Sequence, residues 1–494
     1  MVPPLGPAYV AAALEQAGHR VSVIDALGEA LSSRYPAAHP ALVAYGLTIP
    51  EIVRRIPADT QGVGLSVMFS QLWPHVEAIV QAIRRRFPVV PIFVGGEHAT
   101  ATWSYLLEHC PEVTLCVLGE GELTAVAVAE WIDGRRRIED VGGIARRVDG
   151  KPHLNEARTR VGQPEQLPRP AWHLFPLESY LSRGLGHGVN RGRSIPMLAT
   201  RGCPFQCTFC SSPAMWTTRY ATRPPADVVD EIQSHVARYG ISNVDFEDLT
   251  AIIKRSWILE FCRELERRNV RITYQLPSGT RSEALDRGVL EALSRTGCRN
   301  ITYAPESGST RTLDRIKKRV HLDRMLESMR IAAELGMVVK VNMIIGFPFE
   351  ERRDIWATLR FCMELAKAGV DDIPLYTFVP YPGTELYDEM RREGLVAEMN
   401  NDYFASLGFM DVSQTPSFCK GIGSAELNFY RTGGMMAAAA LAYAAHPSRM
   451  LRTFRNLARG TSESSVELQL SGFLRRSKTL GAVIRYPRWG DRTA

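Results

Sequence analysis

The feature that most constrains the fold is a regular alternation of short apolar segments and amphipathic helices between residues 195 and 379. Strands are predicted at 195–200, 242–246, 272–276, 300–304, 338–345 and 373–379. Helical periodicity covers 227–239, 256–268, 284–295, 324–335 and 355–368. Strands that alternate with helices in this way form a parallel sheet with helical crossovers. We therefore predict a partial (β/α)6 barrel of TIM type over residues 194–395.

The N-terminal part of the chain shows a second α/β pattern. Strands are predicted at 18–25, 62–68, 90–94 and 113–118, with a helix at 75–86. Glycine-rich segments follow two of these strands, at 95–100 and 119–122. Open doubly wound sheets bind ligands beyond the carboxyl ends of their strands, where glycine lets a ligand approach the backbone. We predict a Rossmann-like domain over 1–135, a proline-rich linker over 136–193 and a helical region over 396–494.

Composition excludes several classes of protein. Among the 494 residues, Lys and Arg number 59 against 53 Asp and Glu, a surplus too small to indicate a nucleic-acid partner. The longest apolar run, 435–445, is well short of the roughly 20 residues that span a bilayer, so no transmembrane segment is expected. Nine cysteines are too few, and odd in number, for a secreted disulfide scaffold, which favours a reducing cytoplasm.

Three of the cysteines form a compact motif. Cys203, Cys207 and Cys210 are separated by three and then two residues, directly after the first strand of the predicted barrel. A short loop of this kind can wrap three thiolates around a cubane iron–sulfur cluster and leave one iron open for chemistry. Apolar neighbours, Phe205 and Phe209, would keep the cluster partly dry and tune its potential. A zinc site with a distant fourth ligand is the alternative on spacing alone.

Cys-x3-Cys-x2-Cys with an aromatic residue before the last cysteine resembles the motif of the radical S-adenosylmethionine (SAM) superfamily. The resemblance implies a [4Fe–4S] cluster on Cys203, Cys207 and Cys210, with SAM bound to the open iron through its amino and carboxylate groups. An electron from the cluster would cleave SAM to methionine and a 5′-deoxyadenosyl radical, which abstracts hydrogen from the substrate. A reductant such as flavodoxin or ferredoxin would supply that electron.

The same resemblance implies which residues contact SAM. Glu306, followed by Ser307, matches the carboxylate that binds the ribose hydroxyls; a surface turn acid is the alternative. Asn342 and Ile344 match positions for polar contact and adenine packing, although Ile344 also suits the core. Arg281 offers bidentate donors to the methionine carboxylate, and a solvated arginine at a helix start is equally consistent. Phe209, inside the cysteine motif, is predicted to lie against SAM.

The N-terminal glycine motifs, with Pro3-Pro4-Leu5-Gly6, resemble the cobalamin-binding domain that precedes the barrel in one large class of this superfamily. The predicted cobalamin contacts are Ser70, Gln71, Gly95, Gly96, Glu97, His98, Gly119 and Glu120. The Asp-x-His-x-x-Gly signature of base-off cobalamin proteins is absent, so histidine ligation of cobalt is not expected and the lower face would meet the loop 70–73. A degenerate Rossmann domain without ligand, or one for another nucleotide, is the alternative.

The start of the chain departs from the resemblance. Relatives have a strand before the position of Met1, and without it the parallel sheet would lack a central member. We expect a shortened start.

The two resemblances together imply a cobalamin-dependent radical SAM enzyme. The predicted reaction is methyl transfer to an unactivated carbon of a small-molecule substrate, either a secondary metabolite or a lipid-like compound. A cobalamin-dependent radical cyclase or rearrangement enzyme is the main alternative. A methylthiotransferase acting on transfer RNA is disfavoured because no second cysteine trio lies upstream. A non-catalytic cobalamin-binding regulator is disfavoured by the complete trio and by Glu306.

The C-terminal region is basic. Residues 448–494 hold ten Lys or Arg against three acids, and Arg449, Arg452, Arg455 and Arg459 fall at helical spacing. This pattern allows peripheral contact with a membrane or another acidic partner, and a solvated helix face is the alternative.

Overall fold

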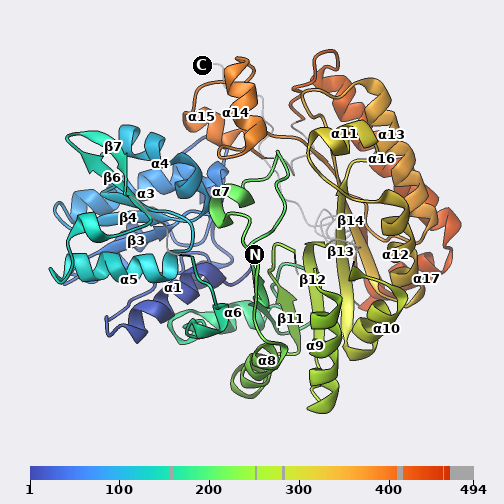
Figure 1. Cartoon of the computed structure of the whole chain (residues 1–494), viewed down its shortest axis with the longest axis horizontal. Coiled ribbons are helices and arrows are strands. Elements are labelled where there is room, and N and C mark those ends of the chain that lie inside the picture. The colour runs from blue at the N-terminus through green and yellow to red at the C-terminus, as the bar shows by residue number, and fades with distance from the viewer. Residues whose placement is uncertain are drawn as a thin grey trace, which may run out of the picture.

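The protein contains two α/β units whose sheets lie side by side (Figure 1). The computed structural model describes residues 1–155, 160–250, 253–280, 284–408, 415–459, 461–464 and 466–467. The predicted fold class is confirmed: a Rossmann-like N-terminal domain precedes a partial barrel and a helical C-terminal region. None of the helices in these described segments is long and apolar enough to cross a bilayer.

The N-terminal sheet has the strand order β3-β4-β5-β6-β7. Its strands are β3 (Val63–Ser66), β4 (Ile92–Gly95), β5 (Leu115–Val117), β6 (Ile144–Val148) and β7 (Lys151–Leu154). The first three are parallel and the last two antiparallel. The domain therefore extends past the predicted boundary at residue 135, because the first part of the predicted linker adds two strands to the sheet.

Helices flank this sheet, and a small hairpin precedes it. The helices are α1 (Leu5–Gln16), α2 (Ile49–Arg55), α3 (Trp73–Arg86), α4 (Glu97–His109) and α5 (Gly121–Ile132). The hairpin pairs β1 (Arg34–Pro36) with β2 (Val43–Tyr45). Helix α2 begins at a capping box, in which the Thr48 backbone N–H and side-chain hydroxyl both donate to Glu51.

The predicted strand at residues 18–25 is wrong. This segment carries no strand hydrogen bonding, although Val21 and Val23 still pack against the core. β3 is the edge of the sheet, and no described strand lies beside residues 18–25 to complete a ladder. A strand needs such a partner for its backbone N–H and C=O groups. The apolar alternation therefore identified a partly buried segment without the neighbour that would make it a strand.

The second sheet is the predicted barrel. Its six strands are all parallel, in the order β15-β14-β13-β12-β11-β8. They are β8 (Ser194–Met197), β11 (Asn243–Phe246), β12 (Thr273–Thr280), β13 (Cys298–Glu306), β14 (Val338–Ile345) and β15 (Leu375–Thr377). The crossover helices are α8 (Pro225–Tyr239), α9 (Arg255–Arg267), α10 (Arg287–Thr296), α11 (Thr310–Arg315), α12 (Leu322–Glu334) and α13 (Arg352–Lys367).

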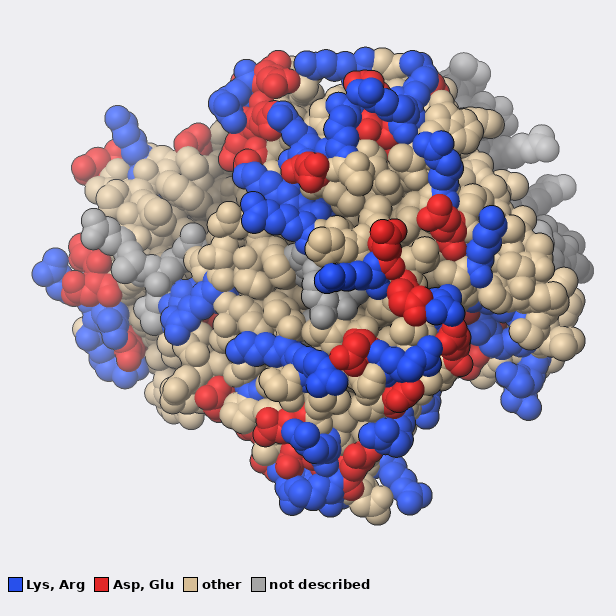
Figure 2. Space-filling model, turned by 45° about the vertical axis from the view of Figure 1, so that its right-hand side comes forward, with Lys and Arg blue, Asp and Glu red and all other residues tan. Residues whose placement is uncertain are grey.

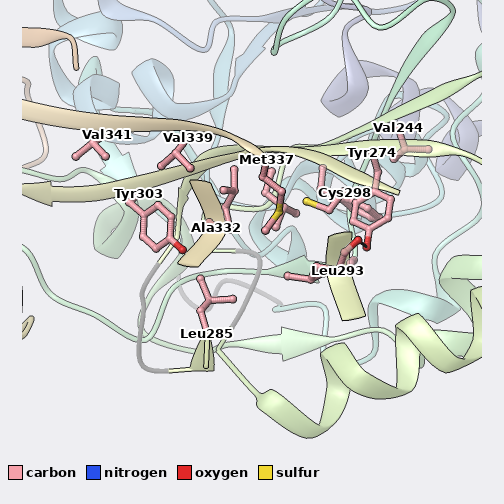
Figure 3. Close-up of a cluster of buried hydrophobic side chains, with 14 of the residues drawn as sticks. Val244, Tyr274, Leu285, Leu293, Cys298, Tyr303, Ala332, Met337, Val339 and Val341 are labelled. Atoms are coloured by element: carbon pink, nitrogen blue, oxygen red, sulfur yellow. Dashed lines mark hydrogen bonds between the residues drawn. The ribbon is translucent and has the colours of Figure 1, made fainter. Parts of the chain in front are cut away.

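The outer face of the barrel sheet packs under its helices. Val339 and Val341 of β14 lie in a buried cluster with Tyr303, Ala332 and Met337 (Figure 3). Because side chains alternate along a strand, the residues of β14 that alternate with these valines point into the barrel. Lys340, Asn342 and Ile344 occupy those inward positions, and all three are half-buried. The strand therefore separates an apolar outer layer from a partly polar interior.

The chain crosses the interior of the barrel just before β8, in the segment 186–189. The backbone N–H of His187 donates to Asp245 (3.1 Å), and the side chain of Gln275 exchanges hydrogen bonds with the backbone of Val189. A Cβ on Gly186 would lie 2.1 Å from a carboxylate oxygen of Asp245, so this approach requires glycine. We call this segment the barrel floor.

The remaining helices surround the barrel. They are α6 (Leu177–Leu181), α7 (Ser212–Trp216), α14 (Glu385–Arg392), α15 (Asn401–Ala405), α16 (Ser424–Ala445) and α17 (Ser448–Arg459). α16 packs along α13 and against β15, so it covers the edge of the sheet. On the face drawn in Figure 2, basic and acidic side chains are interspersed, and uncharged surface covers much of the right-hand side.

Candidate functional site

The cysteine motif lies in a loop between β9 (Thr200–Arg201) and α7, and Figure 1 shows α7 between the two sheets. β9 pairs with β10 (Ala221–Thr222), and a Cβ on Gly202 would lie 2.2 Å from the carbonyl oxygen of Arg219. Farther along, the Thr208 N–H donates to the Ile316 carbonyl (3.1 Å), and the Leu386 N–H donates to the Thr208 carbonyl (2.8 Å). Backbone contacts therefore fix the loop at Gly202, before the first cysteine, and at Thr208, between the second and third cysteines.

Asp248 holds the strand that leads into this loop. Its buried carboxylate accepts hydrogen bonds from the backbone N–H groups of Ala199 (3.1 Å) and Thr200 and from the Thr200 hydroxyl. Burial raises the pKa of Asp248 to about 6. No role was predicted for Asp248. Its position just after a predicted strand was the sequence feature that could have indicated one.

The three cysteines are half-buried, and none of the nine cysteines forms a disulfide. The Cys210 thiol donates to the Ser212 hydroxyl (3.2 Å), and burial raises the pKa of this thiol. In the described segments, no three His, Cys, Asp or Glu side chains are grouped as they would be around a single metal ion. A cubane takes one thiolate at each of three iron corners. Three half-buried thiols on one loop fit that donor set.

Phe209 anchors the loop to the barrel. Its ring makes an edge contact with Phe347, whose ring is fully buried directly after β14 (centroids 5.7 Å apart). Phe347 in turn packs against Phe349 and Phe378. The aromatic layer keeps water from one side of the cysteine loop. The predicted contact of Phe209 with SAM stays a prediction, since the structure assigns this ring a packing role.

Glu306 ends β13 as a buried carboxylate. Its φ is +72°, a left-handed conformation that is uncommon for a residue other than glycine. The Lys318 ammonium lies 3.1 Å from Oε1, and burial raises the pKa of the carboxyl group. Such strain at a strand end supports a functional position. Ser307 differs: its hydroxyl hydrogen-bonds Thr358 and accepts from the Ser309 N–H. Its predicted contact with SAM stays a prediction.

Several buried polar atoms near the barrel's strand ends have no protein partner in the described segments. They include Asn342 Oδ1, Thr280 Oγ1 and Thr377 Oγ1, from β14, β12 and β15. Buried polar groups are almost always hydrogen-bonded, so a missing partner indicates a ligand or water. Asn342 points into the barrel, so its Oδ1 fits a polar ligand such as SAM there, where Asn342 and Ile344 were predicted to contact it. Thr280 and Thr377 pair across the sheet with Tyr303 and Ile345, so they share the outward face. Arg281 lies outside the described residues.

His187 of the barrel floor belongs to a second polar group. His187 Nδ1 is 2.6 Å from Glu247 Oε2, and this hydrogen bond raises the pKa of His187. Glu247 Oε1 is buried without a partner in the described part of the chain. Burial and the charge of Glu247 raise the pKa of Asp245 to about 6. The pairing of His187 with Glu247 was not predicted, because the two residues lie 60 positions apart in the sequence.

The predicted cobalamin loops lie at the carboxyl ends of β4 and β5. Gly96 has a φ of +104°, and a Cβ there would lie 2.6 Å from the Val67 carbonyl oxygen. The Gly119 N–H donates to the Thr100 hydroxyl (2.9 Å). After β3, the large apolar side chains of Met68, Phe69 and Leu72 are each about half exposed. An exposed apolar surface beside glycine loops fits a flat macrocycle. The sequence feature that could have indicated this surface is the apolar run at 67–69.

Two predicted cobalamin contacts, Ser70 and His98, have buried side chains that pair with each other, and their contact with cobalamin stays a prediction. His98 is 1% exposed, and its Nδ1 lies 2.9 Å from the hydroxyl of Ser70, which is also buried. The imidazole packs between the rings of Trp73 and Phe404, and burial lowers its pKa to about 3. His98 and Ser70 are therefore a core pair whose side chains face the protein. His98 does not provide a cobalt ligand in this conformation.

The other predicted contacts differ in their surroundings. Gln71 is half-buried, and its amide lies close to Gly408. Glu120 is buried, and its carboxylate forms ion pairs with Arg160 and Arg201; its predicted contact with cobalamin stays a prediction. Gly95, Gly96, Glu97 and Gly119 lie at the ends of β4 and β5, and their contact with cobalamin stays a prediction.

One surface groove lies away from these loops. It has a volume of about 530 Å³ and runs between α4 and α14, lined by Tyr105, His109, Tyr387 and Arg391 among others. No residue predicted to contact SAM or cobalamin lines it. The candidate site is therefore defined by the cysteine loop and the strand ends around it.

Comparison with known proteins gives two family matches. Residues 197–362 match the radical SAM superfamily, and residues 1–129 match the B12 binding domain. An uncharacterized methyltransferase, PH0819, of Pyrococcus horikoshii is 27% identical over 81% of this chain and 80% of its own length. Cytidylyl-2-hydroxyethylphosphonate methyltransferase of Streptomyces wedmorensis is 29% identical over 80% of this chain and 78% of its own.

A solved structure gives the same result for the fold. The cobalamin-dependent SAM radical enzyme OxsB, with aqua-cobalamin and SAM bound, superposes with a TM-score of 0.69 at 17% identity. The match covers 97% of this chain and 73% of OxsB. At this identity the likeness concerns the arrangement of the two domains and of the helical C-terminal region.

Proposed function

We propose, from the premise that the chain belongs to the radical SAM superfamily and carries an N-terminal B12-binding domain, that it methylates an unactivated carbon of a small molecule. The observation that carries the proposal is the placement of the cysteine loop between the strand ends of the two domains. The names of the methyltransferase relatives support the reaction class. A substrate held at this position would meet both cofactors.

The bound cofactors would supply the reducing electron, the radical from SAM and the methyl group. The chain's own residues would position them. Cys203, Cys207 and Cys210 would hold the cluster, and Glu306 would accept hydrogen bonds from the SAM ribose. The buried Asn342 Oδ1, which has no partner among the described residues, would accept from the amino or hydroxyl groups of SAM. The aromatic layer around Phe347 would exclude water, which would otherwise quench reactive intermediates.

The barrel floor supplies a place for the substrate. The Nδ1 atom of His187 is bound by Glu247, which leaves Nε2 as the other polar atom of the ring, and 45% of the His187 side chain is exposed. An imidazole oriented in this way can accept a hydrogen bond or a proton from a substrate hydroxyl. We propose that His187 and Glu247 hold a polar group of the substrate.

The first prediction tests the reaction itself. After anaerobic reconstitution with iron, sulfide and hydroxocobalamin, the reduced protein is expected to convert SAM to 5′-deoxyadenosine. With candidate substrates it should also release S-adenosylhomocysteine and give a product heavier by one methylene unit. Mass spectrometry of these three compounds is the measurement. A product that loses hydrogen and gains no carbon would indicate a radical cyclase, and absence of 5′-deoxyadenosine would indicate a non-catalytic regulator.

The proposed partners are a small-molecule substrate and a reductant such as flavodoxin or ferredoxin. A cytoplasmic location is proposed with them, supported by nine cysteines without a disulfide and by a cluster that needs a reducing environment.

We also propose peripheral contact of α17 with an anionic membrane surface. Two of its four predicted basic residues face inward: Arg452 hydrogen-bonds Asp371 (2.5 Å), and Arg449 donates to the Val370 carbonyl (2.7 Å). The outward side instead carries Leu451 and Phe454, both more than 70% exposed. Exposed leucine and phenylalanine next to outward arginines, Arg455 and Arg459, fit the boundary between headgroups and acyl chains.

The second prediction tests this contact. The full chain is expected to cosediment with vesicles of phosphatidylcholine and phosphatidylglycerol, and less with phosphatidylcholine alone. Leu451→Ser with Phe454→Ser should reduce binding by about tenfold, because loss of two apolar side chains removes more than about 1.4 kcal/mol of burial. Val89→Ser, at an exposed apolar side chain of the N-terminal domain, is the matched control. Equal binding by the double variant and the control would contradict the proposal.

A further inference from the structure

The cysteine loop is bound at both ends to the N-terminal domain. Before the loop, Arg201 donates from Nη2 to Glu122 Oε1 (2.6 Å), and its Nη1 lies 3.5 Å from Glu120 Oε1. After the loop, the Ser211 hydroxyl donates to Glu97. Arg201 comes two residues before Cys203, and Ser211 directly follows Cys210. Carboxylates of the N-terminal domain therefore hydrogen-bond the residues that flank the cysteines of the barrel domain.

The contact at Arg201 is deeply buried. The side chains of Arg201, Glu120 and Glu122 are 3%, 1% and 6% exposed. A second arginine, Arg160, lies 3.3 Å from Glu120, and the ring of Tyr9 lies 4.9 Å from the Arg201 guanidinium. Two arginines thus face two carboxylates in a site from which water is excluded. Hydrogen bonds between charged groups are strong and directional there, so they fix the position of the β9 backbone.

The carboxylates that bind Arg201 and Ser211 belong to the loops predicted to contact cobalamin. Glu97 directly follows Gly96 at the end of β4, and Glu120 and Glu122 follow Gly119 at the end of β5. A ligand that orders these two loops would also order the carboxylates. The same carboxylates hold the ends of the cysteine loop, so one short path of contacts joins the two cofactor sites.

We propose that Arg201 and Ser211 are positioning residues through which the cobalamin-binding loops hold the cluster loop in place. The inference rests on the proposed function only for the identity of the two cofactors. Neither side chain needs to touch a cofactor, because each acts through the backbone next to a cysteine. Coupling between binding sites is reciprocal, so cobalamin should protect the cluster, and the cluster should favour retention of cobalamin.

The third prediction tests this coupling in the anaerobically reconstituted full chain. The measurement is the rate at which the ferrous chelator bathophenanthroline removes iron, with and without hydroxocobalamin. In the wild type, hydroxocobalamin should slow iron loss by about fivefold or more, the lower end of typical couplings between sites. In Ser211→Ala and Glu122→Gln the protection should fall below about twofold. Both variants should also retain less hydroxocobalamin after gel filtration.

Matched controls separate positioning from general damage. Glu130 lies on α5 of the same domain and forms an ion pair with Arg136. The Glu130→Gln variant removes this ion pair and should keep the protection seen in the wild type. Ser211→Ala removes one hydroxyl, so it remains informative if the buried Glu122→Gln variant does not fold. Arg201→Lys keeps the charge but loses the forked geometry, and it should give an intermediate protection.

The outcomes are distinguishable from failure of the proposed reaction. Protection that persists in folded Ser211→Ala and Glu122→Gln would overturn the positioning role, even if the protein proves to be a methyltransferase. Absence of protection in the wild type would overturn it as well. Loss of protection in both variants would support the role even if the substrate product shows a different radical reaction.

Discussion

Replacing Cys203, Cys207 or Cys210 with alanine is expected to abolish iron binding and the cleavage of SAM. Each cysteine would supply one of three thiolates to a cluster that has no fourth protein ligand in the motif. Loss of a residue that only hydrogen-bonds a metal ligand costs about 10- to 100-fold in metal affinity or activity, so loss of a ligand should exceed about 100-fold. Iron content after reconstitution and formation of 5′-deoxyadenosine are the measurements.

The control for this prediction is another cysteine. Cys110 is buried at the end of α4, where its thiol donates to Glu112, so Cys110→Ala should keep wild-type iron content and SAM cleavage. Two outcomes would contradict the assignment. One is a trio variant that still binds iron and forms 5′-deoxyadenosine; the other is wild-type protein that holds zinc and shows no spectroscopic change when SAM is added.

The strands of the barrel were predictable because their signal is local. The predicted strand at 338–345 coincides with β14, whose valines alternate with the inward residues Lys340 and Asn342. The cysteine motif was predictable for the same reason, because its spacing lies within eight residues. A segment such as 18–25 carries a similar apolar alternation, but a strand also needs a neighbour, and the sequence does not state which neighbours are present.

The direction of a loop side chain could not be read from the sequence. His98 and Glu120 both follow a glycine at a strand end, which is why both were predicted to contact cobalamin. The structure turns His98 into the core, against Trp73, and turns Glu120 toward Arg201. These partners lie 25 and 81 positions away, and no local pattern indicates them. A separation of 60 positions likewise conceals the pairing of His187 with Glu247 at the barrel floor.

Glu306 is the residue outside the cysteine motif whose replacement should most affect SAM binding. Its carboxylate is buried at the end of β13 and pairs with Lys318. Glu306→Gln keeps the shape and removes the charge, so hydrogen bonds to the ribose hydroxyls lose their charge assistance. A hydrogen bond to a charged group contributes about 1.5–3 kcal/mol, which predicts SAM binding weaker by roughly 10- to 100-fold. Equilibrium titration of the reconstituted protein with SAM is the measurement.

Lys318 provides the test that separates ligand binding from local stability. If Glu306 served only to pair with Lys318, then Lys318→Met would weaken SAM binding as much as Glu306→Gln. Breaking a buried pair from either side should also lower the free energy of unfolding by about 3–5 kcal/mol, since one charge is left uncompensated. We expect similar losses of stability in the two single variants and a large loss of SAM affinity only in Glu306→Gln. The double variant should recover stability but not affinity, because the buried charge is gone while the ribose still lacks its carboxylate.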